Sequence, residues 1–192
     1  ELLETSSKFD DFDNSIINTA IKTLRNWDLS TNVSNTNTAL PILSFASILD
    51  VDPINISNDI LIANITDALT HLLHYYKNIN VKWGDINRLI RGETNIELSG
   101  GPDIPRAIYA IPQDNTGQLR SIAGDCYILL ATWDKDGRVS SESIHQYGSA
   151  TQDSKSIHYN DQCELFSNEG FKKISIYKEE VIKNAKKVLI LN

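Results

Sequence analysis

The stretch that most constrains the fold is residues 124–166, which opens with a hairpin signal. An apolar run, YILLATW over residues 127–133, precedes the turn signal Asp134-Lys135-Asp136-Gly137 and a partly alternating segment over residues 139–147. Two such arms joined by a tight turn are typical of a β-hairpin. The first arm is apolar at successive positions, which favours a strand covered on both faces. We therefore expect residues 127–133 to form a central strand of a layered core, and the second arm to lie nearer a surface or a cleft.

Four sequence blocks follow one another along the chain. They are Trp83-Gly84 with Arg88 and Arg91-Gly92; Gly100-Gly101 with Asp103 and Arg106-Ala107; Gly124-Asp125-Cys126-Tyr127; and His158-Tyr159 with Asp161-Gln162 and Leu165-Phe166. Their order over roughly half of the chain resembles the C-terminal part of the large (beta) subunit in the penicillin acylase (penicillin amidase) family of N-terminal-nucleophile hydrolases. Cys126 departs from the pattern, which usually has a small polar residue such as serine there.

The resemblance implies an α+β fold that is part of a four-layer αββα N-terminal-nucleophile hydrolase. A helical N-terminal half would be followed by an antiparallel strand-rich C-terminal half. We expect residues 1–80 to be mainly helical and residues 81–192 to complete the sheet, together forming one lobe of a larger enzyme. The partners would be the remainder of the large subunit and the small subunit.

The resemblance also implies an activity that this chain shares with other polypeptide. Such enzymes use the side chain of their first mature residue, Ser, Cys or Thr, as nucleophile and its α-amino group as base. Glu1 cannot serve, and the family's nucleophile and oxyanion-binding asparagine lie upstream of the segment that Trp27-Asp28 matches. We expect a fragment or processed subunit that supplies scaffold and pocket wall, with no catalytic residue of its own and substrate-binding residues that stay unassigned.

By the same resemblance the whole enzyme would hydrolyse the amide bond of N-acyl compounds, such as β-lactam side chains or acyl-homoserine lactones. It would be exported, to the periplasm or beyond, and calcium, possible in the full enzyme, would be held mostly outside this chain. The alternative is a non-catalytic binding or assembly module that keeps the fold. A third possibility makes Cys126 or Cys163 a thiol nucleophile paired with His145 or His158.

Several side chains admit two interpretations. His158, Asp161 and Gln162 suggest a triad, but without a neighbouring nucleophile we expect a hydrogen-bonded framework that caps a helical turn. His71 and His74 are spaced for a metal without a third ligand nearby, so we expect them on the polar side of a helix. The two cysteines allow one disulfide, and two buried thiols are the favoured alternative.

The glycine pair at Gly100-Gly101 is open to two interpretations as well. It could bring main chain close to a ligand, or form a plain turn between strands. Arg106 could pair with Asp103 or with a substrate carboxylate. The residues do not decide between these alternatives.

Composition excludes two classes of partner. The net charge of -7 without a basic cluster argues against nucleic acid. No apolar run approaches the roughly 20 residues of a membrane span.

Apolar periodicity and turn residues predict further elements. The predicted helices run from residue 14 or 15 to 27, over 38–49, over about five turns to residue 76, and over 179–189, with a short helix or turn after Trp83. A loop is predicted over 117–125, and strands over 95–98 and 171–177.

Overall fold

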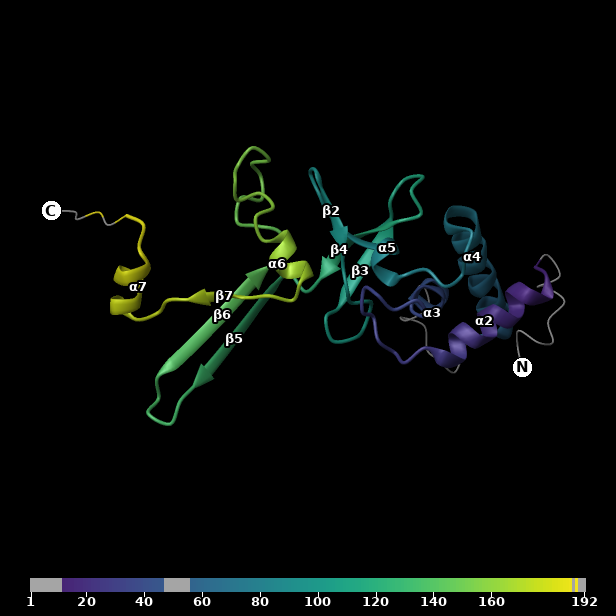
Figure 1. The fold of residues 1–192 in the computed structure, drawn as a ribbon, viewed down its shortest axis with the longest axis horizontal. Helices are drawn as coiled ribbons and strands as arrows, with labels where there is room; N and C mark the ends of the chain where they lie inside the picture. Colours follow the sequence, from purple (N-terminus) through teal and green to yellow (C-terminus); the bar gives the residue numbers. More distant parts are fainter. Residues whose placement is uncertain (1–11, 47–55, 188, 190–192) are drawn as a thin grey trace. The chain divides into compact units, whose positions relative to one another are not determined.

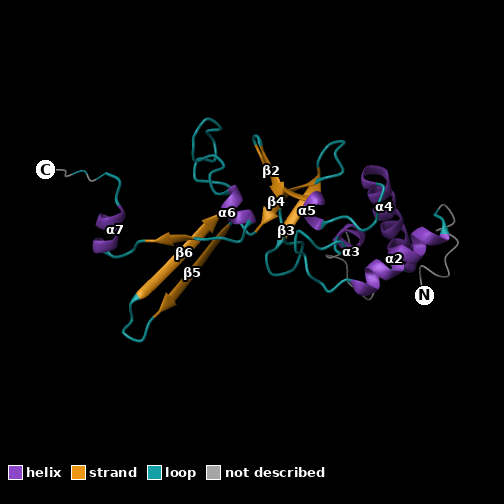
Figure 2. Cartoon of the chain, viewed as in Figure 1, coloured by secondary structure: helices purple, strands orange, loops and turns teal. Residues whose placement is uncertain are grey.

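A computed structural model describes residues 12–46, 56–187 and 189 of the chain. The chain divides into two compact units, Glu1–Gly124 and Asp125–Asn192. The first unit contains helices and a four-stranded sheet, and the second contains a three-stranded sheet with short helices (Figure 1). Figure 2 shows the mixture of helix and strand along the chain. The structure therefore confirms a chain of mixed helix and strand whose strands pair mainly antiparallel.

The helices of the first unit form where the apolar periodicity predicts them. They are α2 (Asn14–Asn26), α3 (Ala39–Phe45), α4 (Asn58–Tyr76) and α5 (Trp83–Ile86). The N-cap of α2 is Asp13, whose carboxylate accepts hydrogen bonds from the next turn, one residue before the predicted caps. The side chain of Ser57 caps α4 in the same way. The predicted end of the second helix, residues 47–49, lies outside the described residues.

The main core of the first unit lies between these helices. Helix α4 supplies the largest share of its buried residues, α3 packs against α4, and Trp83 and Ile86 of α5 belong to the same cluster. The largest buried side chains of this cluster are Leu40, Leu69, Leu72, Trp83 and Ile86. Burial of such apolar side chains stabilises the unit by about 1.5–3 kcal/mol each.

The sheet of the first unit continues from α5. Its strands are β1 (Asn87–Arg91), β2 (Thr94–Glu97), β3 (Ile108–Pro112) and β4 (Leu119–Gly124), in the order β2-β1-β4-β3. Strand β1 is antiparallel to β2 and parallel to β4, and β3 is antiparallel to β4 with a bulge at Tyr109/Ala110. The prediction of a loop over residues 117–125 is wrong for residues 119–124. These residues form β4, which pairs with β1 on one side and with β3 on the other.

The second unit is built on the predicted hairpin. Strands β5 (Tyr127–Trp133) and β6 (Val139–His145) pair without interruption, and β7 (Lys172–Ile174) pairs with the other side of β6. The expected burial is reversed. Strand β5 lies at the edge of the sheet with most of its side chains exposed, whereas Ser141, Ser143 and Ile144 of β6 are buried. The reason is that β6 is flanked by two strands and contacts α6 (Cys163–Ser167), while β5 is paired on one side.

The C-terminal elements are shorter than predicted. The strand expected over residues 171–177 forms only as β7, and the helix expected over 179–189 is α7 (Lys178–Asn184). None of the side chains of α7 is buried. In the described part of the chain, no helix has the length and apolar character that crossing a bilayer requires.

Candidate functional site

The first two sequence blocks meet in a buried hydrogen-bonded node. The indole N–H of Trp83 donates to the carbonyl of Gly100 at 2.8 Å, and the Asn87 amide donates to Leu98 O at 2.8 Å and to Gly100 O at 3.4 Å. Gly100 has a φ of +96°, and a Cβ there would lie 2.5 Å from the carbonyl oxygen of Arg106. The close approach that this glycine permits is therefore to the protein's own backbone.

Other polar side chains of these blocks also contact their own unit. Arg88 donates from Nε to Asn95 Oδ1, from one terminal nitrogen to Gly84 O and from the other to Asn95 O, each at 2.8 Å. It therefore ties the start of β1 to α5 and β2. The carboxylate of Asp103, considered above as a partner for Arg106, accepts a hydrogen bond from the hydroxyl of Tyr109.

A small pocket of about 130 Å³ adjoins the node. Its wall is mainly apolar, with Ile42, Trp83, Ile108 and Leu119 among the lining side chains. The Asn87 amide nitrogen on this wall already donates to backbone carbonyls. Among the described residues that line the pocket there is no Ser, Thr, Cys, His, Asp or Glu.

The last block forms the predicted framework in the second unit. His158 Nδ1 lies 2.8 Å from Asp161 Oδ2, and both side chains are substantially exposed. The side chain of Gln162 accepts a hydrogen bond from the backbone N–H of His145 at 3.1 Å. Gln162 occupies the N-cap position of α6, but its side chain makes no capping bond. Gln162 therefore links α6 to β6 and does not cap α6 as expected.

The two thiols differ in their surroundings. Both cysteines are free, with Cys163 buried and Cys126 exposed. The expectation of a buried thiol is correct for Cys163, whose sulfur lies 3.9 Å from Tyr147 O, and wrong for Cys126. Cys126 directly precedes the edge strand β5, whose side chains are mostly exposed as well. Its carbonyl accepts a hydrogen bond from Gln146 at 3.1 Å and so closes the open end of the hairpin.

The histidines of α4 make structural contacts. His71 Nε2 lies 2.9 Å from the carbonyl oxygen of Gly117, and since a carbonyl only accepts, this nitrogen donates. His74 is exposed and meets the ring of Tyr75 edge-on at 4.6 Å between centroids. Within the described ranges, no group of three or more His, Cys, Asp or Glu side chains is placed to hold a metal ion.

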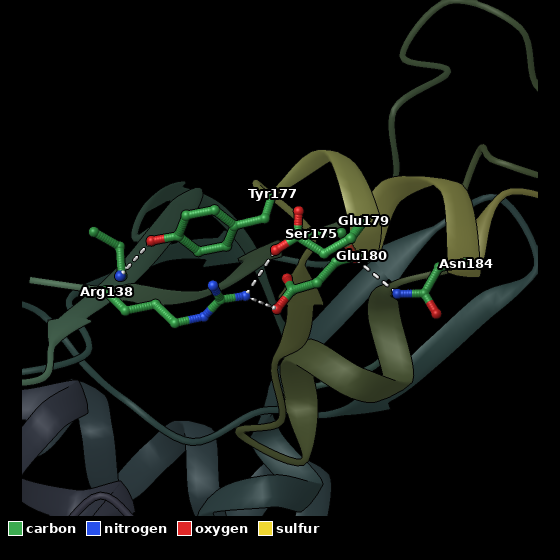
Figure 3. Close-up of polar contacts among 7 residues, drawn as sticks. Arg138, Ser175, Tyr177, Glu179, Glu180 and Asn184 are labelled. Atoms are coloured by element: carbon green, nitrogen blue, oxygen red, sulfur yellow. Dashed lines mark hydrogen bonds and ion pairs between the residues drawn. The ribbon is translucent and has the colours of Figure 1, made fainter. Parts of the chain in front are cut away.

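The second unit also contains a polar cluster that sequence reasoning did not find. We call it the Arg138 clasp: Arg138 with Tyr177, Glu179 and Glu180 (Figure 3). One guanidinium nitrogen lies 3.2 Å from a carboxylate oxygen of each glutamate, and the guanidinium carbon lies 3.9 Å from the centroid of the Tyr177 ring. The Tyr177 hydroxyl accepts from the N–H of Val139 at 2.7 Å. The clasp fastens α7 to the turn end of the hairpin.

Charge pairing shifts the titration of the clasp. Hydrogen bonds to Glu179 and Glu180 raise the pKa of Arg138. The pKa of Glu179 is lowered, first by a hydrogen bond to its own backbone N–H and then by Arg138. A pocket of about 310 Å³ beside the clasp is lined by charged and polar side chains together with Trp133, Val139 and Ile174. Exposed ion pairs of this kind orient an element rather than perform chemistry.

The contacts of the four sequence blocks are thus structural. Comparison with known proteins shows to which family the chain belongs. A family model described as penicillin amidase matches residues 6–183. The chain belongs to the penicillin amidase family. Among solved structures it is similar to a thermostable penicillin G acylase from Alcaligenes faecalis, with 17% identity and a TM-score of 0.33. That match covers 80% of this chain and 28% of the other chain, so the chain spans under a third of that acylase chain's length.

Proposed function

We propose that this chain is the C-terminal portion of an amidohydrolase that resembles penicillin acylase. The observation that carries the proposal is the family match over residues 6–183. The geometry supports a scaffold role, because the side chains of Trp83, Asn87 and Arg88 bond to backbone of their own unit. The nucleophile would then lie in polypeptide outside residues 1–192.

In the whole enzyme the reaction would be amide hydrolysis by an N-terminal nucleophile. The side chain of that residue attacks the carbonyl carbon, and its α-amino group accepts the proton directly or through water. Hydrogen-bond donors stabilise the tetrahedral oxyanion before the amine leaves, and water then hydrolyses the acyl-enzyme. The contribution of this chain is to hold the wall and framework in place, which positions those groups without touching the reacting atoms.

The proposal extends to partners and location. The chain would pack with the remainder of the large subunit and with the small subunit, as part of a four-layer αββα arrangement. The substrate would be a small N-acyl compound, such as a β-lactam with an acyl side chain or an acyl-homoserine lactone. Calcium, if the enzyme holds it, would be bound mostly by residues outside this chain, and the enzyme would be exported.

The test is to express the intact protein and identify its mature N-termini by sequencing. We expect one mature chain to begin with Ser, Cys or Thr, and the protein to hydrolyse members of a panel of N-acyl β-lactams and acyl-homoserine lactones. Replacing that first residue with alanine should abolish turnover, while His158→Gln should retain it. A folded protein without such an N-terminus and without hydrolysis would instead support a non-catalytic binding or assembly module.

A further inference from the structure

The turn between β5 and β6 contains Asp136-Gly137, the single Asp-Gly pair of the chain. All residues of the turn, 134–138, are exposed. The Asp136 carboxylate makes no hydrogen bond or ion pair with any residue that the structure describes. Covalent changes to a chain concentrate at exposed loop tips of this kind. An aspartate before glycine is also prone to attack by the following backbone nitrogen, because glycine has no Cβ to crowd that nitrogen.

The covalent structure holds the two reacting groups together. A bond from the Gly137 nitrogen to the side-chain carbonyl carbon of Asp136 closes a five-membered ring, so the reaction needs no encounter. A Cβ built on Gly137 would meet no atom within 4 Å, so the turn leaves room beside this residue. One hydrogen bond restrains the attacking nitrogen, since the N–H of Gly137 donates to Asp134 O at 3.0 Å. A bond at an exposed turn opens at little cost in free energy.

The reaction is an exchange of one water molecule. The Gly137 nitrogen bonds to Cγ of Asp136 and loses its proton, and one oxygen of the carboxyl group, in its acid form, leaves with that proton as water. The cyclic imide then takes up water. Opening at Cγ restores aspartate, whereas opening at the main-chain carbonyl carbon leaves Gly137 attached through Cγ, which is isoaspartate. No oxidant, reductant or cofactor takes part, and the mass and the negative charge of the residue are unchanged.

Isoaspartate does not fit the geometry of this turn. Its main chain runs through Cβ and Cγ, so the loop between Asp134 and Arg138 gains one backbone atom. That loop is held at both ends, since Asp134 N–H donates to Arg138 O at 2.9 Å and Arg138 N–H donates to Asp134 Oδ1 at 2.8 Å. An additional bond lengthens the chain by about 1.5 Å, whereas hydrogen-bond distances vary over only about 0.5 Å. The loop therefore cannot keep both bonds in their present form.

The residue that follows this loop is the centre of the Arg138 clasp (Figure 3). The Arg138 guanidinium lies 3.2 Å from Glu179 and from Glu180, and it stacks on the ring of Tyr177. The next residue, Val139, donates its N–H to the Tyr177 hydroxyl at 2.7 Å. Because all of these contacts start from two consecutive residues of the hairpin, a shift of the main chain at Arg138 disturbs them together.

We propose that Asp136-Gly137 is a modification site, at which Asp136 isomerises to isoaspartate through a cyclic imide, and that the product releases α7 from the Arg138 clasp. The inference goes beyond the proposed function and does not depend on it. Neither the reaction nor the clasp involves an amide substrate.

The first test measures the reaction itself. The intact protein is incubated in neutral buffer, and isoaspartate is located by electron-transfer fragmentation, which cleaves the additional main-chain Cα–Cβ bond. Asp153-Ser154 is the internal comparison, because it is also exposed but its second residue carries a Cβ. We expect isoaspartate at residue 136 to accumulate about tenfold faster than at residue 153, as a barrier lower by about 1.4 kcal/mol gives. Equal rates at the two positions would overturn the proposal.

Two variants test the route through the imide. Asp136→Glu keeps the charge but would need a six-membered ring, so we expect no isomerisation at this position. Asp136→Asn keeps the five-membered ring and releases ammonia in place of water. The amide needs no proton before it is attacked, so isoaspartate should form faster in this variant than in the parent. An Asp136→Asn protein that forms isoaspartate no faster than the parent would exclude the imide route.

The second test measures the consequence for α7. The isomerised protein is separated from the unmodified protein by chromatography, and amide hydrogen exchange is compared in the two. We expect amides of α7 to exchange several-fold faster in the isomerised protein, while those of α6 are unchanged. Asp136→Glu protein incubated for the same time is the control for other effects of ageing. An isomerised protein whose α7 exchanges at the unmodified rate would overturn the proposed release.

Discussion

The hydroxyl of Tyr76 is a buried polar group without a hydrogen-bond partner among the described residues. Burial and, to a smaller extent, the charge of Asp85 raise the pKa of Tyr76 to about 12, against an opposing effect of Arg88. The phenol thus stays neutral in the folded protein while the unfolded chain ionises near its ordinary pKa of about 10. Titration of this group therefore leaves the stability of the protein unchanged below about pH 10 and lowers it as the pH rises from 10 toward 12, because folding then requires the phenol to take up a proton.

Tyr76→Phe is therefore expected to flatten the dependence of stability on pH between 10 and 12, because the two side chains differ only in the hydroxyl that titrates. At neutral pH the variant should be as stable as the parent or more stable by up to about 1 kcal/mol, because an unpartnered hydroxyl is removed. Denaturant midpoints across this pH range measure both effects. Tyr75→Phe, at a more exposed ring, is the control, and an equal response of the two variants would contradict the prediction.

Gly124 and Gly137 share a positive φ but differ in the space around them. A Cβ at Gly124, with φ +120°, would lie 2.0 Å from the carbonyl oxygen of Ala107, whereas Gly137, with φ +79°, has no atom within 4 Å. We expect Gly124→Ala to lower the free energy of unfolding by about 3 kcal/mol or more, because backbone must move. Gly137→Ala should cost about 1 kcal/mol of backbone strain alone. Chemical denaturation distinguishes them, and similar losses would show that the β3–β4 backbone yields easily.

At the scale of elements, the Arg138 clasp determines whether α7 stays on the hairpin. Arg138→Met removes the ion pairs to Glu179 and Glu180, so we expect amides of α7 to exchange faster while those of α6 are unchanged. Because the Glu179 pKa is lowered in the folded state, its contact is present above the ordinary glutamate range and is lost as the pH falls through the lowered value. In the parent protein, the amides of α7 should therefore lose protection against exchange when the pH is lowered below about 4.

The same acid titration should leave Arg138→Met unaffected, because its clasp is already absent. Lys135→Met, at the exposed hairpin turn, removes a charge of the same sign and serves as the matched control. An α7 that keeps its protection in Arg138→Met would mean that Tyr177 alone holds the helix through its bond to Val139.

Local signals in the sequence indicated the type of the helices and of the hairpin strands, but they missed strand β4 and the burial of the hairpin. The apolar period over α4 and the turn residues between β5 and β6 predict both elements, since each depends on neighbours within a few positions. The run YILLATW correctly indicates a strand, but the predicted cover on both faces is wrong, since β5 is an exposed edge strand. It cannot indicate that β6 is the central strand within the chain, because this depends on β7, which is distant in sequence.

The candidate site shows the same dependence on sequence separation. The pairing of His158 with Asp161 was predictable because the two residues are three positions apart. The bond from Trp83 to Gly100 spans 17 positions, and that from Arg138 to Glu179 spans 41. Their partners follow from the folded topology, since neither glycine carbonyls nor exposed glutamates carry a sequence signal. Family membership found the blocks, but the structure was needed to show that they bond to their own backbone.

At the scale of the whole molecule, the exposed face of β5 predicts opposite effects of one substitution in two settings. Residues 1–192 expressed alone should associate, because Leu130 and its apolar neighbours on β5 are exposed. Leu130→Lys should reduce that association, measured by light scattering. In the intact protein the same change would place a charge inside an apolar interface and should lower the free energy of unfolding by about 2–4 kcal/mol.

Ile60→Lys is the matched control, since Ile60 is 42% exposed but stands on α4, where no strand edge is open. It should alter neither the association of the separate chain nor the stability of the intact protein by more than about 0.5 kcal/mol. If Leu130→Lys reduced the association of the separate chain without lowering the free energy of unfolding of the intact protein, the β5 surface would be solvated in both. Opposite signs would mean that the surface which makes the separate chain associate is the one that the rest of the protein covers.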